Sequence, residues 1–294
     1  MRLNFTIYIS LFLMLNLAPS FLSGQVLSDS MYKDMGVSIS PSTMHLNVKP
    51  GESYTRDIRL KNETDQFYEF VVGFQDFEMS TAGKASMSFT PEKDDSEELE
   101  NKGAKYGLSK HIIVTPNAFS LKPGEEIKLK VVVDIPDEEE NYVAKWGIIT
   151  IDQIYERQPL DPGDQPNRLA MGVIPTFGFG VFVYQNPPNV KINQLDIDAF
   201  RFEKTEKGNR VVMSVKNVGD GITYCVSYLE LMNLKTGIQQ KLQNKTFTIL
   251  PLHHRIFNYE MPAGLLPGKY SAVGVVDYGH KEEIIAAELE FEIQ

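Results

Sequence analysis

The chain reads Phe119-Ser-Leu-Lys-Pro-Gly-Glu125 and continues directly into Glu126-Ile-Lys-Leu-Lys-Val-Val-Val-Asp-Ile135. Proline fixes φ at one position of the turn and glycine accepts a positive φ at the next, so the Pro-Gly pair ends one extended run and begins another. After the turn, apolar side chains alternate with charged ones, which is the period of a strand with one buried face. This stretch therefore predicts a β-sandwich.

The same turn recurs along the chain, as Leu46-Asn-Val-Lys-Pro-Gly-Glu52 and, more loosely, as Leu265-Leu-Pro-Gly-Lys-Tyr270. Short apolar runs with turn signals between them predict many short strands, as in immunoglobulin-like sandwiches. The Pro-rich link Gln185-Asn-Pro-Pro-Asn189 removes backbone donors and should interrupt the strand ladder. We therefore expect two tandem immunoglobulin-like β-sandwich domains, all-β, over residues 36–185 and 190–294.

The N-terminal residues 1–24 have the composition of a secretory signal peptide. Arg2 provides the positive start, Ile7–Ala18 is apolar, and Pro19 interrupts this run before it is long enough to cross a bilayer. No later transmembrane segment is expected, because glutamates interrupt the apolar C-terminal run. The chain should therefore be secreted, to the periplasm or the cell exterior.

The composition of the chain and its lack of known motifs argue against several classes of function. The formal net charge of −10 argues against nucleic acid, which is bound by neutralising phosphates. The single cysteine, Cys225, allows no internal disulfide, and we expect it to be a buried apolar residue. No catalytic motif, metal-ligand spacing or cofactor fingerprint is present. We therefore expect a protein that is not an enzyme and has no metal or cofactor.

The candidate site is the strand Thr176-Phe-Gly-Phe-Gly-Val-Phe-Val-Tyr184, which follows a long Pro-containing loop, Tyr155–Leu169. One face should carry Phe177, Phe179, Val181 and Val183, and the other face has two glycines. Glycine in a strand marks either a close approach of neighbours in a buried strand or a place where another backbone can approach. The second interpretation predicts an edge that accepts a partner strand, through Phe177, Gly178, Phe179, Gly180, Val181, Phe182 and Val183.

This order of features resembles the PapD-like periplasmic pilus-assembly chaperones. The matching features are Asn62 after the second strand, the Phe-x-Leu-x-Pro-Gly-Glu turn, Trp146 before an alternating run, the long loop, the apolar last strand and the Pro link, with Val215-Lys-Asn-Val-Gly219 in the second domain. The chain is also similar to two-domain Gram-positive surface proteins that bind WxL-type wall proteins. The resemblance implies a chaperone-like protein that binds another envelope or surface-fibre protein.

The resemblance also implies a cleft between the domains, in which a first-strand Arg and a last-strand Lys of those chaperones clamp a terminal carboxylate. Here the first strand has His45 and no Arg, and the last strand has no Lys. Arg168 precedes the last strand, but neither it nor His45 matches the motif cleanly.

Two other functions remain open. The sandwiches could be spacers or adhesion modules of a surface complex, acting through exposed loops such as Tyr155–Leu169. The chain could instead bind carbohydrate through a surface row of aromatic side chains, for which the candidates are Tyr224, Tyr228, Tyr259, Tyr270 and Tyr278.

Overall fold

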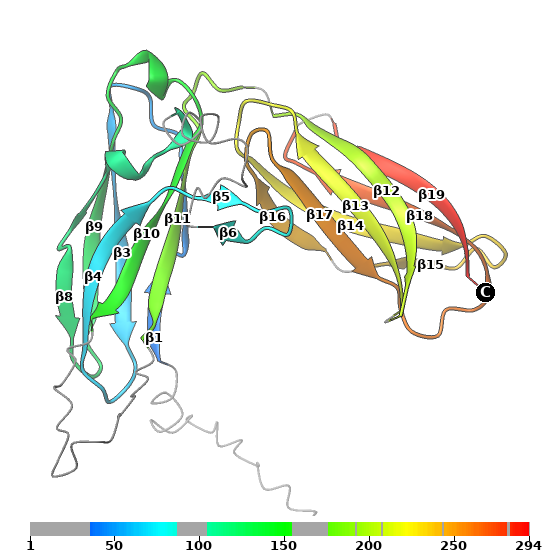
Figure 1. Cartoon of the computed structure of the whole chain (residues 1–294), viewed down its shortest axis with the longest axis horizontal. Coiled ribbons are helices and arrows are strands. Elements are labelled where there is room, and N and C mark those ends of the chain that lie inside the picture. The colour runs from blue at the N-terminus through cyan, green and yellow to red at the C-terminus, as the bar shows by residue number, and fades with distance from the viewer. Residues whose placement is uncertain are drawn as a thin grey trace, which may run out of the picture.

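The computed structural model describes residues 36–86, 105–154, 176–191, 193–206, 208–242, 244–280 and 283–293. Within these ranges the chain is nearly all β-structure, and its strands form two sandwiches joined end to end (Figure 1). The expected fold class is confirmed. The expected signal peptide and the loop Tyr155–Leu169 lie outside the described residues.

The first sandwich consists of two facing sheets. One sheet has the order β1-β3-β9-β7, formed by Val37–Ser40, Ser53–Asn62, Glu126–Asp134 and Ile112–Thr115. The other has the order β2-β11-β10-β4-β8, formed by Thr43–Leu46, Gly178–Gln185, Lys145–Ile154, Tyr68–Gln75 and Ala118–Leu121. The chain changes sheets between β1 and β2, at Pro41. Strand β1 therefore forms an edge of one sheet, and β2 forms an edge of the other.

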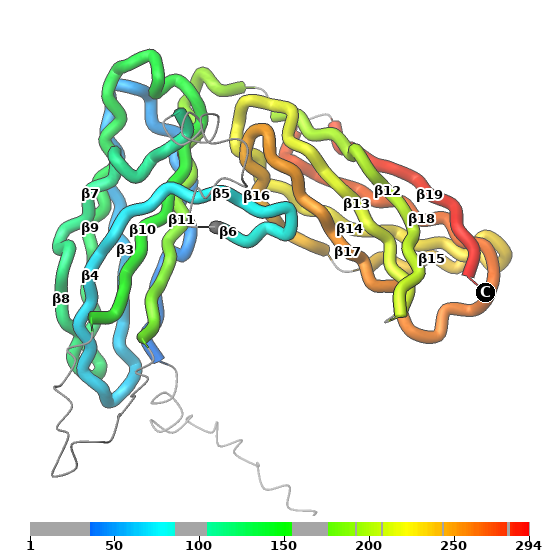
Figure 2. The backbone as a smooth tube through the Cα atoms, in the orientation of Figure 1, coloured from blue at the N-terminus to red at the C-terminus, as the bar shows by residue number. Residues whose placement is uncertain are grey.

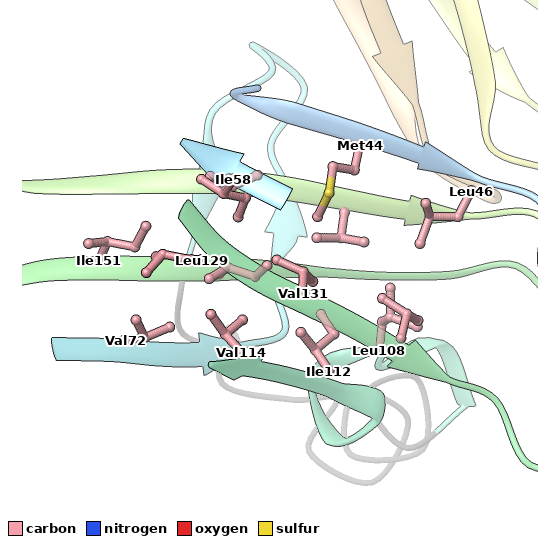
Figure 3. Packing of buried hydrophobic residues seen from close by; sticks show 14 of the residues in the cluster. Met44, Leu46, Ile58, Val72, Leu108, Ile112, Val114, Leu129, Val131 and Ile151 are labelled. Atoms are coloured by element: carbon pink, nitrogen blue, oxygen red, sulfur yellow. The ribbon is translucent and has the colours of Figure 1, made fainter. Parts of the chain in front are cut away.

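The core of the first sandwich lies between these sheets. Figure 3 shows side chains from both sheets meeting there, among them Met44, Ile58, Val72, Leu129 and Ile151. The alternation of β9 places Leu129, Val131 and Val133 in this core, each at most 1% exposed, as the opening stretch predicts. The repeated turn takes the expected conformation, because Gly51 and Gly124 have φ of 90° and 75°.

A buried asparagine closes the corner of each sandwich. In the first, Asn62 is fully buried; its Nδ2 donates to the carbonyl oxygens of Gln66 (2.7 Å), Leu121 (3.2 Å) and Lys122 (3.1 Å), and its Oδ1 accepts from the backbone N–H of Thr64. The Pro-Gly turn is bonded to the same residue, because Gly124 N–H donates to the Asn62 carbonyl oxygen.

The second sandwich repeats this corner with Asn217, whose Nδ2 donates to the carbonyl oxygens of Gly221 and Ile249. One of its sheets has the order β12-β13-β17, formed by Leu195–Thr205, Gly208–Asn217 and His254–Glu260. The other has the order β15-β14-β18-β19, with β16 also paired to β14, formed by Gln239–Lys241, Thr223–Asn233, Gly268–Asp277, Ile285–Ile293 and Lys245–Ile249.

A small hairpin, β5 (Glu78–Met79) and β6 (Ala85–Ser86), leaves the first sandwich after β4 and reaches the second (Figure 2). A third apolar cluster joins the two sandwiches, with Phe77, Trp146, Ile148 and Tyr184 packing beside Ile222 and Leu250. Strands β5, β6 and β15 have only two or three residues each, which is too few for an alternating pattern to be detected in the sequence.

Lys145 is fully buried at the start of β10, where its Nζ donates to the Lys105 carbonyl oxygen at 2.7 Å. In the described part of the chain it forms no ion pair. Burial, together with the charge of Lys110, lowers the pKa of its ammonium group.

We therefore expect Lys145→Met to be at least as stable as the wild type at pH 7, and the difference to shrink as the pH rises. The unfolded chain holds this proton up to its ordinary pKa of about 10.4 and the folded chain releases it earlier, so the wild type gains stability across that interval. Urea unfolding at several pH values measures the difference. A variant that is less stable at pH 7 would instead show that the bond to Lys105 outweighs the cost of burying the charge.

Candidate functional site

Strand β11 lies between β10 and β2 for only part of its length. It pairs antiparallel with β10 along its whole extent, from Lys145↔Gln185 to Asp152↔Gly178. Its pairing with β2 is parallel and covers only the C-terminal half of β11, from Phe182↔Thr43 to Gln185↔Leu46. Among the described residues, no strand pairs with the side of β11 opposite β10 over the residues that precede Phe182.

The direction of the backbone groups along β11 follows from two hydrogen bonds. Gln153 N–H donates to the Phe177 carbonyl oxygen at 3.0 Å, so Phe177 directs its backbone groups toward β10. Phe182 N–H donates to the Ser42 carbonyl oxygen at 3.1 Å, so Phe182 directs its groups to the opposite side. Since these directions alternate along an antiparallel strand, the N–H and C=O groups of Gly178 and Gly180 point to the side of β11 that no described strand covers.

The seven predicted site residues therefore fall into two groups. Phe177, Gly178, Phe179, Gly180 and Val181 lie beside the uncovered edge, which we call the open edge of β11. Phe182 and Val183 are paired with β2, because the chain crosses to this sheet at Pro41 and β2 then covers the C-terminal half of β11. Sequence reasoning missed this limit, although Pro41 between two short apolar runs was the available signal.

Side chains next to the open edge are apolar and incompletely covered. Phe177 is 38% exposed and contacts Tyr68, Phe70 and Phe179 edge-on or at an angle. Phe179 is partly buried against the core, as are Val37 and Ile39 of β1, the edge strand of the opposite sheet. The apolar side chains at both of these edges therefore pack against the same core and are only partly buried.

The two glycines have different surroundings on the outer face. A Cβ on Gly180 would lie 2.7 Å from Cδ1 of Ile148, which is buried in the cluster between the sandwiches. A Cβ on Gly178 would lie 2.4 Å from Oδ1 of Asp152, an exposed side chain that can turn away. Close packing therefore accounts for Gly180, whereas Gly178 is exposed and free of that constraint.

A cleft of about 400 Å³ lies between the sandwiches beside β2, lined by Thr43, His45, Tyr224, Cys225, Val226, Thr246, Phe247 and Thr248. The His45 ring meets the Tyr224 ring edge-on at 4.0 Å. Burial, and then the charge of Arg56, lowers the pKa of His45, so its imidazole is neutral at pH 7. Burial raises the pKa of the Cys225 thiol to about 12, which agrees with an unreactive core cysteine.

The described lining of this cleft has no lysine, arginine or carboxylate. Two described arginines adjoin it, because Arg56 is close enough to His45 to lower its pKa and the Arg255 guanidinium lies 5.8 Å from the Phe247 ring centre. Neither arginine belongs to the lining of the cleft. Arg168 lies outside the described residues.

Several solved structures are similar to this chain over most of its length. The YadV chaperone has a TM-score of 0.41 at 12% identity, covering 88% of this chain and 100% of its own. The E. coli chaperone DraB has a TM-score of 0.39 at 16% identity, covering 86% and 98%. The class 5 fimbriae chaperone CfaA has a TM-score of 0.40 at 11% identity, covering 86% and 98%. The chain is similar to PapD-like periplasmic pilus chaperones.

No family model matches the sequence, and no curated protein matches it. At these identities and TM-scores, the site has to be argued from the pairing and packing of this chain alone.

The remaining candidates give no site in the described residues. Of the five tyrosines expected to form an aromatic row for carbohydrate, Tyr259, Tyr270 and Tyr278 are at most 5% exposed, whereas Tyr228 is half-buried and Tyr224 is 38% exposed. The five side chains therefore do not form one surface row. In the described part of the chain, no three His, Cys, Asp or Glu side chains are grouped as a metal site requires. None of the described helices is long and apolar enough to cross a bilayer.

Proposed function

We propose that this chain is a non-enzymatic, chaperone-like protein of the periplasm or cell exterior, which binds an extended segment of another envelope protein along the open edge of β11. The observation that carries the proposal is the direction of the Gly178 and Gly180 backbone groups. A strand added here would pair with them, and its side chains would cover Phe177 and Phe179. This mode of recognition takes affinity from backbone bonds and selectivity from side-chain pockets.

The length of the open edge limits the bound segment. Pairing can begin near Gly178 and must end at Phe182, where Ser42 already occupies the position. At about 3.3 Å per residue, roughly four partner residues can pair directly with β11. The apolar side chains of Val37, Ile39 and Phe179 favour a segment with apolar residues at alternate positions.

Amide hydrogen exchange in the free protein tests the geometry. We expect the amides of Phe179 and Val181 to exchange slowly, because they bond to β10, and those of Gly178 and Gly180 to exchange quickly. NMR measurement of the four amides would show the alternation. Four equally slow amides would mean that another part of the chain covers the edge, and the proposal would fail.

A matched pair of variants tests binding. Gly178→Pro removes a backbone donor that points to the open edge and breaks no bond to β10, whereas Gly178→Ala adds a similar Cβ and keeps the donor. With a partner isolated by crosslinking from the host's envelope, we expect Gly178→Pro to weaken binding at least about tenfold, which corresponds to about 1.4 kcal/mol. Gly178→Ala should lose much less. Equal losses in both variants would point to a steric effect and against strand pairing.

The spacer alternative predicts that this edge binds nothing. It would be favoured if the isolated partner bound equally well to the wild type and to Gly178→Pro.

A further inference from the structure

A turn and a loop at the far end of the second sandwich carry exposed apolar side chains. The turn, residues 233–238, joins β14 to β15, and the loop, residues 261–267, joins β17 to β18. Figure 1 shows β15 and the end of β19 on the side of the second sandwich that is farthest from the first sandwich. This end of the molecule is therefore remote from the open edge of β11 and from the cleft between the sandwiches.

In the described part of the chain, the two most exposed large apolar side chains are Ile238 of the turn and Leu266 of the loop, at 69% and 67% exposed. They line one hollow of about 170 Å³ together with the partly buried Leu265, and its described lining has no charged side chain. We call Ile238, Leu265 and Leu266 the tip patch. A contiguous apolar surface of this kind is more typical of an interaction site than single scattered side chains are.

The turn that presents Ile238 has an internal acceptor for each of its backbone N–H groups. Those of residues 233, 234 and 237 donate to the carbonyl oxygens of Ile238, Lys269 and Asn233, at 3.0, 3.0 and 2.8 Å. Those of residues 235 and 236 both donate to Oδ1 of Asn233 at 3.0 Å, and that of Ile238 donates to Oγ1 of Thr236 at 3.4 Å. An N–H group without an acceptor is costly where water is excluded. This turn can therefore leave water without stranding a donor.

The charges around the tip patch are positive. Residues 231–259 include four Lys or Arg side chains and no Asp or Glu, in a chain whose formal net charge is −10. Two exposed lysines adjoin the patch, because Lys235 is in the same turn as Ile238 and Lys269 directly follows the loop and Gly268. Glu292 is opposite Lys269 in the register of β18 and β19, yet neither lysine forms an ion pair with a described residue. The patch and its surroundings thus complement a surface that is apolar and anionic.

We propose that the tip patch inserts into the surface of an anionic phospholipid bilayer, with Ile238 and Leu266 among the acyl chains and Lys235 and Lys269 at the headgroup phosphates. Peripheral binding of this kind takes free energy from the apolar area that is buried and from the attraction of lysines to anionic lipids. It is independent of the proposed strand binding, because the tip patch and the open edge of β11 belong to different sandwiches.

A bilayer fits these observations better than a protein segment or a second copy of the chain does. A bound strand pairs with free backbone groups, as at the open edge of β11, and the turn 233–238 has no free N–H group to offer. Two copies that met through the same patch would bring their own lysines together, and like charges at an interface repel. A bilayer surface needs no matching shape, and it leaves lysine ammonium groups in contact with phosphates and water.

Vesicle flotation of the secreted form tests the proposal. The expected signal peptide has to be removed first, because its apolar run, residues 7–18, would itself bind lipid. One set of vesicles contains phosphatidylglycerol and phosphatidylethanolamine, and a second set contains phosphatidylcholine alone. We expect the wild type to float with the anionic vesicles and to bind the neutral ones at least about tenfold more weakly.

Three variants assign the binding to the tip patch. Ile238→Ser should weaken binding to the anionic vesicles at least about tenfold, because the isoleucine side chain no longer enters the acyl region. Lys235→Gln should weaken the same binding about fivefold and leave the weak binding to phosphatidylcholine unchanged. Ile113→Ser is the matched control, since Ile113 is 58% exposed on β7 of the first sandwich, and it should bind like the wild type. All three positions are exposed, so urea unfolding should show wild-type stability for each variant.

The proposal is overturned if the wild type does not float with the anionic vesicles, or if Ile113→Ser loses as much binding as Ile238→Ser. Sedimentation velocity of the free protein examines the second-copy alternative. A dimer of the wild type that Ile238→Ser abolishes would assign the tip patch to a contact between copies, and this result would also overturn the proposal.

Discussion

Asn62→Ala is expected to lower the free energy of unfolding by about 3 kcal/mol. The substitution leaves the carbonyl oxygens of Gln66, Leu121 and Lys122 without their side-chain donor, and an unpaired buried polar group costs about 1–3 kcal/mol. It also removes the acceptor for Thr64, so the segment between β3 and β4 loses its anchor. For a domain of about 150 residues, the loss corresponds to a fall in Tm of about 6–12 °C.

Three further variants separate this explanation from a general cost of mutating asparagine. Asn217→Ala should have a similar effect, because its amide makes the equivalent bonds in the second sandwich. Asn62→Asp should be at least as damaging at pH 7, since it directs a carboxylate at carbonyl oxygens. Asn47→Ala should cost less than about 1 kcal/mol, because that side chain is exposed and makes one bond to the Asn186 carbonyl oxygen. Urea unfolding measures the free energy of unfolding of all four variants. Equal losses for Asn47→Ala and Asn62→Ala would contradict the proposed role of Asn62 in closing the corner.

The strands were predictable where alternation is long. The run that became β9 alternates over its nine residues, and its apolar face forms the core. Strand β10 was found as an apolar run, but its first seven residues are buried on both faces, so the alternation expected there was wrong. The faces of β11 also followed from its sequence, because Phe179 and Val181 pack in the sandwich core while Phe182 packs beside the junction cluster.

The extent of the open edge was not predictable in the same way. It depends on which strand lies beside β11 and where that strand begins, and β2 is more than a hundred residues away in the chain. Nε2 of His253 lies 2.6 Å from Oε2 of Glu78, and this contact was hidden for the same reason, since the two residues are 175 positions apart and β5 has only two residues. Periodicity reports burial of a face, whereas sites formed by edges and junctions depend on long-range pairing.

The two glycines of β11 show how the structure resolves an ambiguity that the sequence leaves open. Glycine in a strand indicates either close packing or an approach route for a partner, and here each position has its own explanation. Gly180 faces Ile148, which is 1% exposed, so its lack of a side chain is required by the junction cluster. Gly178 faces the exposed Asp152 and is not required by any buried neighbour.

Gly180→Val is therefore expected to lower the free energy of unfolding by about 1–3 kcal/mol, the usual cost of overpacking a core. Gly178→Val should be neutral or slightly stabilising, because Asp152 can turn into solvent and valine favours extended backbone. Ile148→Ala alone should cost about 2–5 kcal/mol through the cavity it leaves. In the double variant Gly180→Val with Ile148→Ala, the new side chain fills part of that cavity, so the combined loss should be smaller than the sum by at least about 1 kcal/mol. Urea unfolding of the four variants closes this cycle. Additive losses would show that the two positions do not compete for space, and Gly180 would then have to be explained by the open edge alone.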